Sequence, residues 1–303
     1  MGLILKEMIS IGENRLITAG VMSPKLDAEL LYMDLAGIDK TRLFMEWSRE
    51  IDDKICEEYF ERIARRADRE PLQYITGKQS FMGIDFTVNE KVLIPRPETE
   101  LMVEHAIKMI RGSRPDEGAP AEAAELLKKA AARKKWSVLD LCCGSGAIGV
   151  TIANRCMNAK VTASDISPEA VEVAKKNAAK ARAKVRFSVG DLFSAGKAKK
   201  NFDMIISNPP YVKTMMIPIL QEEVKDHEPV SALDGGADGL DFYRRIIEEA
   251  PQHLKKKGLL ILETGHDQGD DIRKLVEEQG AYEDCVILKD YNNQDRVCIA
   301  LAR

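Results

Sequence analysis

The feature that most constrains the fold of this chain is a regular alternation of buried-strand and amphipathic-helix patterns after Trp136. We expect strands at 138–141, 160–164, 185–189, 203–207 and 258–262, helices at 147–156, 168–181, 241–255 and 267–278, and final strands near 282–288 and 296–302. Such alternation is typical of a mostly parallel sheet with helices on both faces. The last two strands leave no room for a helix between them, so they should form an antiparallel hairpin through residues 291–294. The sequence therefore predicts an α/β fold.

The first part of the chain has a helical pattern instead. Ser23-Pro24 is typical of a helix start and Gly37 of its end, and a further helix is expected from Asp52 to Arg69. The apolar stripe of that second helix consists of Ile55, Tyr59, Ile63 and Ala67, and its other face carries Arg62, Arg65, Arg66 and Arg69. We interpret the arginines as a solvated face, with a contact surface for an acidic partner or RNA as the alternative.

Two stretches connect these parts. Residues 73–77 and 81–88 combine alternation, aromatic side chains and turn glycines, which predicts a short β-hairpin. Residues 111–135 are rich in Ala, Glu, Lys, Gly and Pro, and we expect a surface helix with a flexible lead-in. Because 303 residues exceed what one core usually organises, we predict a helical domain over 1–72, a hairpin linker over 73–95 and an α/β domain over 96–303.

Composition narrows the class of protein without revealing chemistry. No apolar run approaches the roughly 20 residues that span a bilayer, and the first residues lack a signal-peptide pattern. The six cysteines have no metal-ligand spacing and suit reduced thiols. We therefore expect a cytoplasmic protein with neither a metal site nor a membrane partner. The net charge of −4 also argues against direct binding to a long nucleic acid.

The loop after the first strand of the α/β part predicts a nucleotide-type cofactor. It contains Gly144-x-Gly146-x-x-Gly149, whose glycines permit a tight turn and let backbone N–H groups approach an anion. That anion is either a pyrophosphate or the carboxylate of a methionine moiety. Asp165 ends the next strand, about 20 residues further on, where a carboxylate can accept both ribose hydroxyls. A nucleoside cofactor is expected, and at this point its identity is open.

Asp191-Leu192 ends the third strand. In a fold of this kind it lies across from Asp165, where an adenine would rest. The Asp191 carboxylate can accept a hydrogen bond from the adenine amino group, while Leu192 or Phe193 packs on the ring. The alternative is a turn former, a common role of acidic residues after strands.

The tetrapeptide Asn208-Pro209-Pro210-Tyr211 follows the fourth strand, at the sheet edge where open α/β folds bind ligands. Both Asn208 and Pro209 precede a proline and are held extended, and neither proline has an N–H. The motif therefore presents rigid acceptors, the Asn208 side-chain oxygen and the Pro209 carbonyl, beside the aromatic ring of Tyr211. A planar NH₂ group has two donors that need two acceptors. Together with the cofactor loop, these residues predict methyl transfer from a sulfonium to a planar nitrogen.

With these motifs the chain resembles the release-factor glutamine N5-methyltransferase family (the HemK/PrmC group) over nearly its whole length. The similar segments are 27–31, 71–77, Ile94-Pro95-Arg96-Pro97-Glu98-Thr99-Glu100, the glycine loop, Asp165, 191–193, 208–211 and Glu263-Thr264-Gly265. The resemblance implies a Rossmann-like class I methyltransferase fold, a mostly parallel seven-stranded sheet with a C-terminal antiparallel hairpin, preceded by a small helical bundle that recognises the substrate. It also implies the cofactor S-adenosyl-L-methionine and, as substrate, the glutamine of the Gly-Gly-Gln loop of peptide chain release factors.

Site residues carry over by position. The resemblance implies that the methyl donor is contacted by Cys142, Cys143, Gly144, Ser145, Gly146, Asp165, Asp191, Leu192 and Asn208, and that the glutamine is held by Asn208, Pro209, Pro210 and Tyr211. Two departures are visible. Cys142-Cys143 stands where the family often has small residues such as glycine and threonine, and the segment 111–135 is longer than usual.

Other functions use some of the same residues. An adenine N6-methyltransferase would apply the Asn208 acceptors to a flipped base, but it should also carry a basic recognition region. A glutamine methyltransferase acting on a ribosomal protein would share the same chemistry. An NAD oxidoreductase fits the glycine loop but lacks a candidate proton donor. A non-catalytic binding module would bind its partner without cofactor and without turnover.

Overall fold

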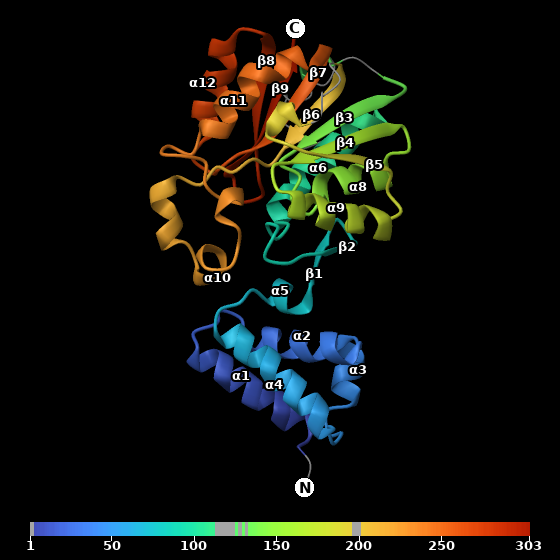
Figure 1. Cartoon of the computed structure of the whole chain (residues 1–303), viewed down its shortest axis with the longest axis vertical. Helices are drawn as coiled ribbons and strands as arrows, with labels where there is room; N and C mark the ends of the chain where they lie inside the picture. Colours follow the sequence, from blue (N-terminus) through green and yellow to red (C-terminus); the bar gives the residue numbers. More distant parts are fainter. Residues whose placement is uncertain (1–2, 113–124, 127–128, 131–132, 196–200) are drawn as a thin grey trace. The chain divides into compact units, whose positions relative to one another are not determined.

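The structure, a computed structural model, describes residues 3–112, 125–126, 129–130, 133–195 and 201–303 (Figure 1). The chain forms two compact units. The first comprises the residues up to Lys78 together with Leu220–His227, and the second comprises Gln79–Ile219 together with Glu228–Arg303. The short segment 220–227, which follows the tetrapeptide in sequence, therefore belongs to the helical unit, and the sequence gives no sign of this.

The first unit is a small helical bundle. Its helices are α1 (Leu5–Thr18), α2 (Pro24–Ala36), α3 (Lys40–Met45), α4 (Asp53–Ala67), α5 (Leu72–Thr76) and α10 (Glu222–Lys225). The predicted helices near 23–37 and 52–69 are confirmed as α2 and α4, and Gly37 ends α2 with φ of 64°. Leu31, Tyr59 and Ile63 are fully buried in one shared apolar core.

The arginine face of α4 differs from the prediction of a solvated surface. Arg66 is only 7% exposed. Its Nε donates to Asp27 Oδ2 at 2.8 Å and its Nη2 donates to Glu223 Oε1 at 3.1 Å. Arg69 also donates to Glu223, through Nη2 at 2.8 Å. The solvated interpretation is therefore wrong for Arg66, because carboxylates brought by α2 and α10 pair with it.

The connecting hairpin is shorter than predicted. Residues Leu72–Thr76 form helix α5, and only β1 (Lys78–Phe81) and β2 (Ile84–Thr87) are strands. The turn between the strands places Met82 at φ 52° and Gly83 at φ 73°, a left-handed pair typical of tight hairpins. The strand prediction for residues 73–76 is wrong, because Gly77 at φ 71° ends a helical turn there.

The second unit contains a seven-stranded sheet of order β5-β4-β3-β6-β7-β9-β8. Its strands are β3 (Trp136–Leu141), β4 (Ala159–Asp165), β5 (Val185–Val189), β6 (Phe202–Ser207), β7 (Leu254–Glu263), β8 (Tyr282–Lys289) and β9 (Asp295–Ala302). The first five of these pair in parallel, and β9 pairs antiparallel with both β7 and β8. The predicted parallel sheet and its antiparallel ending are confirmed. From β3 the chain adds β4 and β5 on one side of the sheet, and it then continues with β6 on the other side of β3. In open α/β sheets, ligands bind at the carboxyl ends of the strands where this change of direction occurs, here between β3 and β6.

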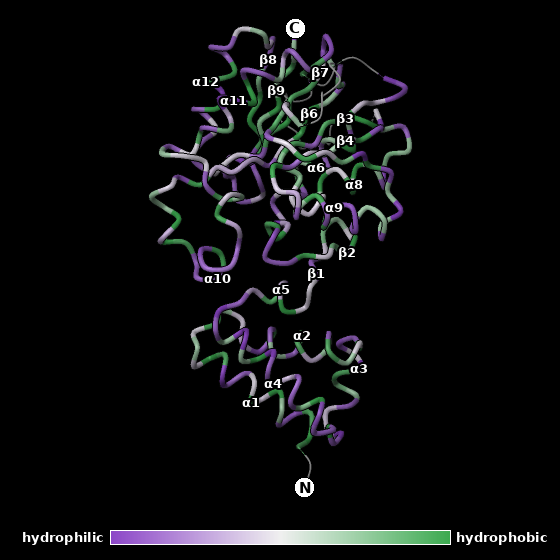
Figure 2. Tube along the Cα trace, in the orientation of Figure 1, coloured by the Kyte–Doolittle hydropathy of each residue, from purple (hydrophilic) through white to green (hydrophobic). Residues whose placement is uncertain are grey.

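Helices cover both faces of this sheet (Figure 1). They are α6 (Pro97–Arg111), α8 (Ala147–Arg155) and α9 (Pro168–Lys180) on one side, and α11 (Asp241–Glu249) and α12 (Gly269–Gln279) on the other. Successive strand residues alternate between two cores: Val138 and Ile206 pack with α6 and α8, whereas Leu139 and Ile205 pack with α11. The central strands are accordingly hydrophobic on both faces, as their green colour in Figure 2 shows.

The helix predicted over 241–255 ends at Glu249, because Pro251 follows and residues 250–252 turn into the long strand β7. The surface helix predicted over 111–135 falls mostly outside the described residues. Within the described part of the chain, no helix is long and apolar enough to cross a membrane.

Candidate active site

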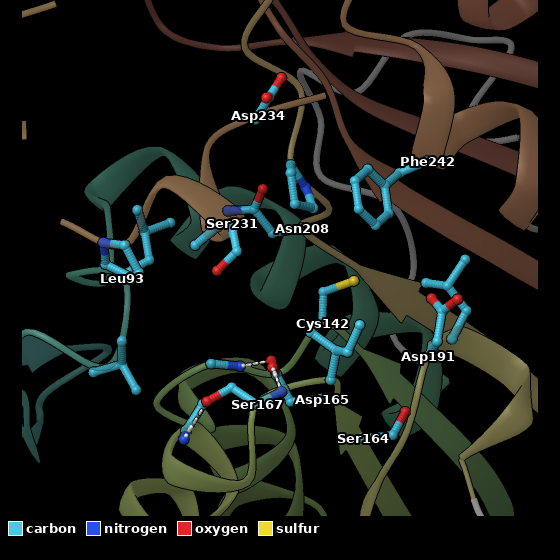
Figure 3. Close-up of a pocket in the computed structure, with 18 of the residues that line it drawn as sticks. Leu93, Cys142, Ser164, Asp165, Ser167, Asp191, Asn208, Ser231, Asp234 and Phe242 are labelled. Carbon is cyan, nitrogen blue, oxygen red and sulfur yellow. Dashed lines mark hydrogen bonds between the residues drawn. The ribbon is translucent and has the colours of Figure 1, made fainter. Parts of the chain in front are cut away.

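The carboxyl ends of β3, β4, β5 and β6 converge on one cavity of about 390 Å³. This lies within the size range of small-molecule sites and at the position where open α/β sheets bind ligands. Figure 3 shows Asp165 on one side of the cavity and Asn208 on the other, with Cys142 between them in this view. The strand ends that the sequence singled out therefore meet at one place.

The glycine loop begins directly after β3 and is held by short backbone contacts. Cys142 has φ of 56°, Gly144 has φ of 52° and Gly146 has φ of 81°, so three residues of the loop are left-handed. Gly146 N donates to Cys143 O at 2.7 Å, closing the turn before α8. A Cβ on Gly146 would stand 3.0 Å from the Ala174 side chain, which explains glycine there. A non-glycine residue in this conformation, such as Cys142, marks local strain of the kind found at functional sites.

Asp165, at the end of β4, is fixed by the loop itself. Its Oδ2 accepts from Gly144 N at 2.8 Å and its Oδ1 accepts from Ser167 N at 3.0 Å. Burial raises the pKa of this carboxyl above its ordinary value, while these backbone hydrogen bonds lower it in part. Each carboxylate oxygen keeps a second lone pair, so Asp165 can still accept from a ligand in the cavity.

The end of β5 supplies Asp191 and Leu192. Arg245 Nη2, from α11, donates to Asp191 Oδ2 at 2.5 Å, and Phe242 of the same helix also lines the cavity. Leu192 has φ of 46°, a second strained non-glycine position in the cavity wall. Phe193, the alternative ring partner, is 5% exposed and stacks on His253 with ring centroids 4.5 Å apart. Leu192 is therefore the member of this pair that faces the cavity.

The tetrapeptide after β6 is anchored on both sides. Ser207, the last residue of β6, donates from Oγ to Leu141 O at 2.8 Å and so ties the ends of β6 and β3 together. Asn208 Nδ2 donates to Thr99 Oγ1 at 3.3 Å. Tyr211 Oη donates to Glu263 Oε1 at 3.4 Å, and burial raises the pKa of Tyr211 above its ordinary value.

A second wall of the cavity comes from residues 91–93 and 229–234, which carry no motif of their own, although Ile94 and Arg96 beside them belong to the family-like segment 94–100. Val212 N donates to Leu233 O, and Gly235 N donates to Val212 O, each at 2.8 Å, so residues 230–235 run beside the tetrapeptide. Glu228, 4% exposed, accepts from Ile94 N at 3.2 Å and from Arg96 Nη2 at 2.5 Å. These contacts fix residues 91–93 and 229–234 at the cavity, where several of them form its lining.

Seven of the predicted residues line this cavity, namely Cys142, Gly144, Asp165, Asp191, Leu192, Asn208 and Pro210. The other predicted residues, Cys143, Ser145, Gly146, Pro209 and Tyr211, stand behind the lining and shape its backbone. Lining residues that sequence reasoning missed include Leu93, Ser231, Asp234, Phe242 and Arg245. Phe242 and Arg245 are three residues apart in α11 and therefore lie on the same face of the helix. This spacing could have predicted that the two side chains point to one place.

Two family models match parts of this chain. Residues 113–225 match the Methyltransferase small domain model, and residues 7–77 match the PrmC N-terminal domain model. The catalytic domain of hMettl16, solved with the MAT2A 3′UTR hairpin 1, has a TM-score of 0.54 at 12% identity, covering 89% of this chain and 88% of that one, which shows likeness of fold alone. The fold and the domain match define a class I methyltransferase dependent on S-adenosyl-L-methionine.

Curated relatives identify the family. The release factor glutamine methyltransferase of Koribacter versatilis is 40% identical, covering 90% of this chain and 91% of its own. That of Bacillus subtilis is 38% identical, covering 90% of each chain, and that of Moorella thermoacetica is 36% identical over 99% of each. This chain belongs to the release factor glutamine methyltransferase family. The resemblance drawn from the sequence motifs, the predicted fold class and the predicted cofactor are confirmed.

Proposed function

We propose that this enzyme transfers a methyl group from S-adenosyl-L-methionine to the side-chain amide nitrogen (N5) of the glutamine in the Gly-Gly-Gln motif of peptide chain release factors. The observation that carries the proposal is the position of Asn208, which lines the same cavity as Asp165 (Figure 3). The two residues lie at the carboxyl ends of β6 and β4, the strands on either side of β3. The names of relatives at 33–40% identity support glutamine in a release factor as the acceptor.

The cavity residues suit the methyl donor. Asp165 would accept from the ribose hydroxyls and Asp191 from the adenine amino group, while Leu192 and Phe242 offer apolar surface to the base. At Gly144 a Cβ would meet no atom within 4 Å, so the backbone borders open space. When bound, S-adenosyl-L-methionine supplies a methyl group on an electrophilic sulfonium.

The tetrapeptide prepares the acceptor nitrogen. An amide nitrogen is a poor nucleophile because its lone pair is delocalised into the carbonyl group. Asn208 Oδ1 and the Pro209 carbonyl would accept hydrogen bonds from its two N–H groups. This would allow the nitrogen to pyramidalise toward the methyl group. Because prolines fix the backbone on which both acceptors sit, the arrangement is preorganised and needs no strong base. Once methylated, the nitrogen would lose one of its two protons to solvent, and the methyl donor would leave as a neutral thioether.

Mass spectrometry of a release factor incubated with the enzyme and the methyl donor tests the proposal directly. We expect one added methyl group on the Gly-Gly-Gln peptide, and none when that glutamine is replaced. Asn208→Ala should reduce transfer by at least about 100-fold while the affinity for the methyl donor, measured by calorimetry, stays nearly unchanged. Methylation of a ribosomal protein or an adenine in parallel incubations, with none on the release factor, would overturn the proposed substrate. Near-normal turnover by Asn208→Ala would overturn the mechanism.

A further inference from the structure

Two buried polar residues stand behind the tetrapeptide. Thr99, in the first turn of α6, is 4% exposed, and Glu263, at the end of β7, is 1% exposed. Thr99 Oγ1 lies 2.6 Å from Glu263 Oε2 and 3.3 Å from Asn208 Nδ2. Glu263 Oε1 also accepts from Tyr211 Oη at 3.4 Å. Both polar side chains of the tetrapeptide therefore depend on one buried carboxylate, Asn208 through Thr99 and Tyr211 directly.

Proton counting fixes the direction of this chain of hydrogen bonds. A threonine hydroxyl has one proton, and an ionised carboxylate can only accept. A separation of 2.6 Å is typical of an O–H donating to a carboxylate, so with Glu263 ionised the Thr99 hydroxyl donates a hydrogen bond to Glu263. Thr99 can then only accept from Asn208, which must turn its NH₂ group toward Thr99. The Asn208 Oδ1 is left for the cavity.

We propose that Thr99 and Glu263 are positioning residues that fix the carboxamide of Asn208 with its oxygen, and not its nitrogen, toward the acceptor amide. This inference rests on the proposed function, in which Asn208 Oδ1 accepts an N–H of the glutamine. A reversed carboxamide would direct its NH₂ group at an N–H of the glutamine, so that two donors would face each other. It would also place the Asn208 oxygen against the Thr99 oxygen, so that two acceptors would face each other. Neither Thr99 nor Glu263 lines the cavity, so both act through the tetrapeptide, Thr99 through Asn208 and Glu263 through Asn208 and Tyr211.

The protonation state of Glu263 controls the same orientation. Burial raises the pKa of Glu263 to about 7, with Glu98 raising it slightly and Thr99, Arg296 and Tyr211 lowering it. If Glu263 were protonated on Oε2, it would donate a hydrogen bond to the Thr99 oxygen. The Thr99 hydroxyl would then direct its own proton toward Asn208, and this would favour the reversed carboxamide. The productive form is the ionised one. Its population grows as pH rises through about 7, so the turnover rate should rise over that range.

The kinetic test uses the full chain with a release factor and the methyl donor. Thr99→Val, which keeps the shape and removes the hydroxyl, should lower kcat about 10- to 100-fold and leave the affinity for the methyl donor within about twofold. Thr99→Ser should restore most of that loss. Glu263→Gln should abolish the rise of kcat near pH 7. Wild-type kcat in Thr99→Val, or an unchanged pH profile in Glu263→Gln, overturns the proposal.

A buried threonine elsewhere provides the matched control. Thr151 in α8 is fully buried, and its hydroxyl has no hydrogen-bond partner among the described residues. Thr151→Val should therefore leave kcat and its pH profile as in the wild type. A loss in Thr151→Val equal to that in Thr99→Val would show that any buried threonine has this effect, and would overturn the proposal.

A spectroscopic measurement separates this inference from the proposed substrate. In protein labelled with ¹⁵N-asparagine, the side-chain NH₂ signal of Asn208 is identified by its loss in Asn208→Ala. That signal should shift in Thr99→Val and much less in Thr99→Ser, whatever the acceptor of the methyl group is. An unmoved signal in Thr99→Val overturns the positioning role. If the wild type fails to methylate the release factor while the signal behaves as expected, only the proposed substrate fails.

Discussion

Asn177 in α9 offers a direct test of how the glycine loop is supported. Its side chain is 2% exposed and joins three segments that are distant in sequence. Nδ2 donates to Thr87 O at 3.0 Å and to Ser145 O at 2.9 Å, while Oδ1 accepts from Thr87 N at 2.7 Å. One amide therefore holds the end of β2 and the glycine loop against α9.

The magnitude follows from these three contacts. Removing the side chain leaves three backbone groups without their partner in a buried place, at about 1 kcal/mol for each. Asn177→Ala should thus lower the free energy of unfolding of the second unit by about 3 kcal/mol. Asn177→Asp keeps the shape and one acceptor but offers no donor to the two carbonyls, so it should destabilise at least as much. Asn154→Ala, which removes a single exposed bond to Ala181 O, should change stability by less than about 1 kcal/mol.

Urea unfolding followed by tryptophan fluorescence measures the effect. The chain has two tryptophans, Trp47 in the first unit and Trp136 in β3. In a Trp47→Phe background the signal reports the second unit alone. Calorimetry with the methyl donor should also show weaker binding by Asn177→Ala, because Ser145 loses its anchor. A loss of stability below about 1 kcal/mol, or one equal to that of Asn154→Ala, would refute the reasoning.

Two other substitutions test single contacts. Asp165→Ala removes the expected ribose acceptor and should weaken methyl-donor binding roughly 10- to 100-fold by calorimetry; unchanged affinity would refute the assignment. Arg66→Met leaves the buried Asp27 without its cation and should destabilise the first unit by about 3 to 5 kcal/mol in urea unfolding followed by Trp47 in a Trp136→Phe background. Its control is Arg65→Met, whose partner Glu70 is also acidic but whose own side chain is 44% exposed, so the loss should stay below about 1 kcal/mol. Equal losses in the two arginine variants would contradict this account.

Much of the α/β unit could be predicted because its pattern is local. A strand buried on both faces is rich in apolar residues, as in Val138–Leu141, where Asp140 is the exception, and in Met204–Ile206, which Ser207 ends. Parallel strands bring these ends to one edge of the sheet. Asp165, Asp191 and Asn208 were therefore expected close together, and the cavity gathers all three.

Contacts between distant segments were beyond the reach of such patterns. The arginines of α4 have the spacing of a solvated face, and the sequence does not show that Glu223, more than 150 residues later, pairs with Arg66. Similarly, Gln73–Thr76 has the aromatic and β-branched residues of a strand, yet forms a helical turn because Gly77 closes it. The burial of Arg66 is decided by its distant partner, and the helical turn of Gln73–Thr76 is decided by the geometry at Gly77. The periodicity of the sequence encodes neither.

The two sides of the cavity differ in this respect. The side proposed for the methyl donor consists mainly of residues at the carboxyl ends of β3, β4 and β5, with support from Asn177 of α9 and from Phe242 and Arg245 of α11. The acceptor side depends on contacts gathered from across the unit: Thr99 of α6 holds Asn208, Glu263 of β7 holds Thr99 and Tyr211, and Glu228 holds Ile94 and Arg96. Substitutions among these supporting contacts are therefore expected to affect methyl transfer more than methyl-donor binding. The tetrapeptide supplies two acceptors that suit any planar NH₂ group, and on the proposal above its supports set how those acceptors are oriented.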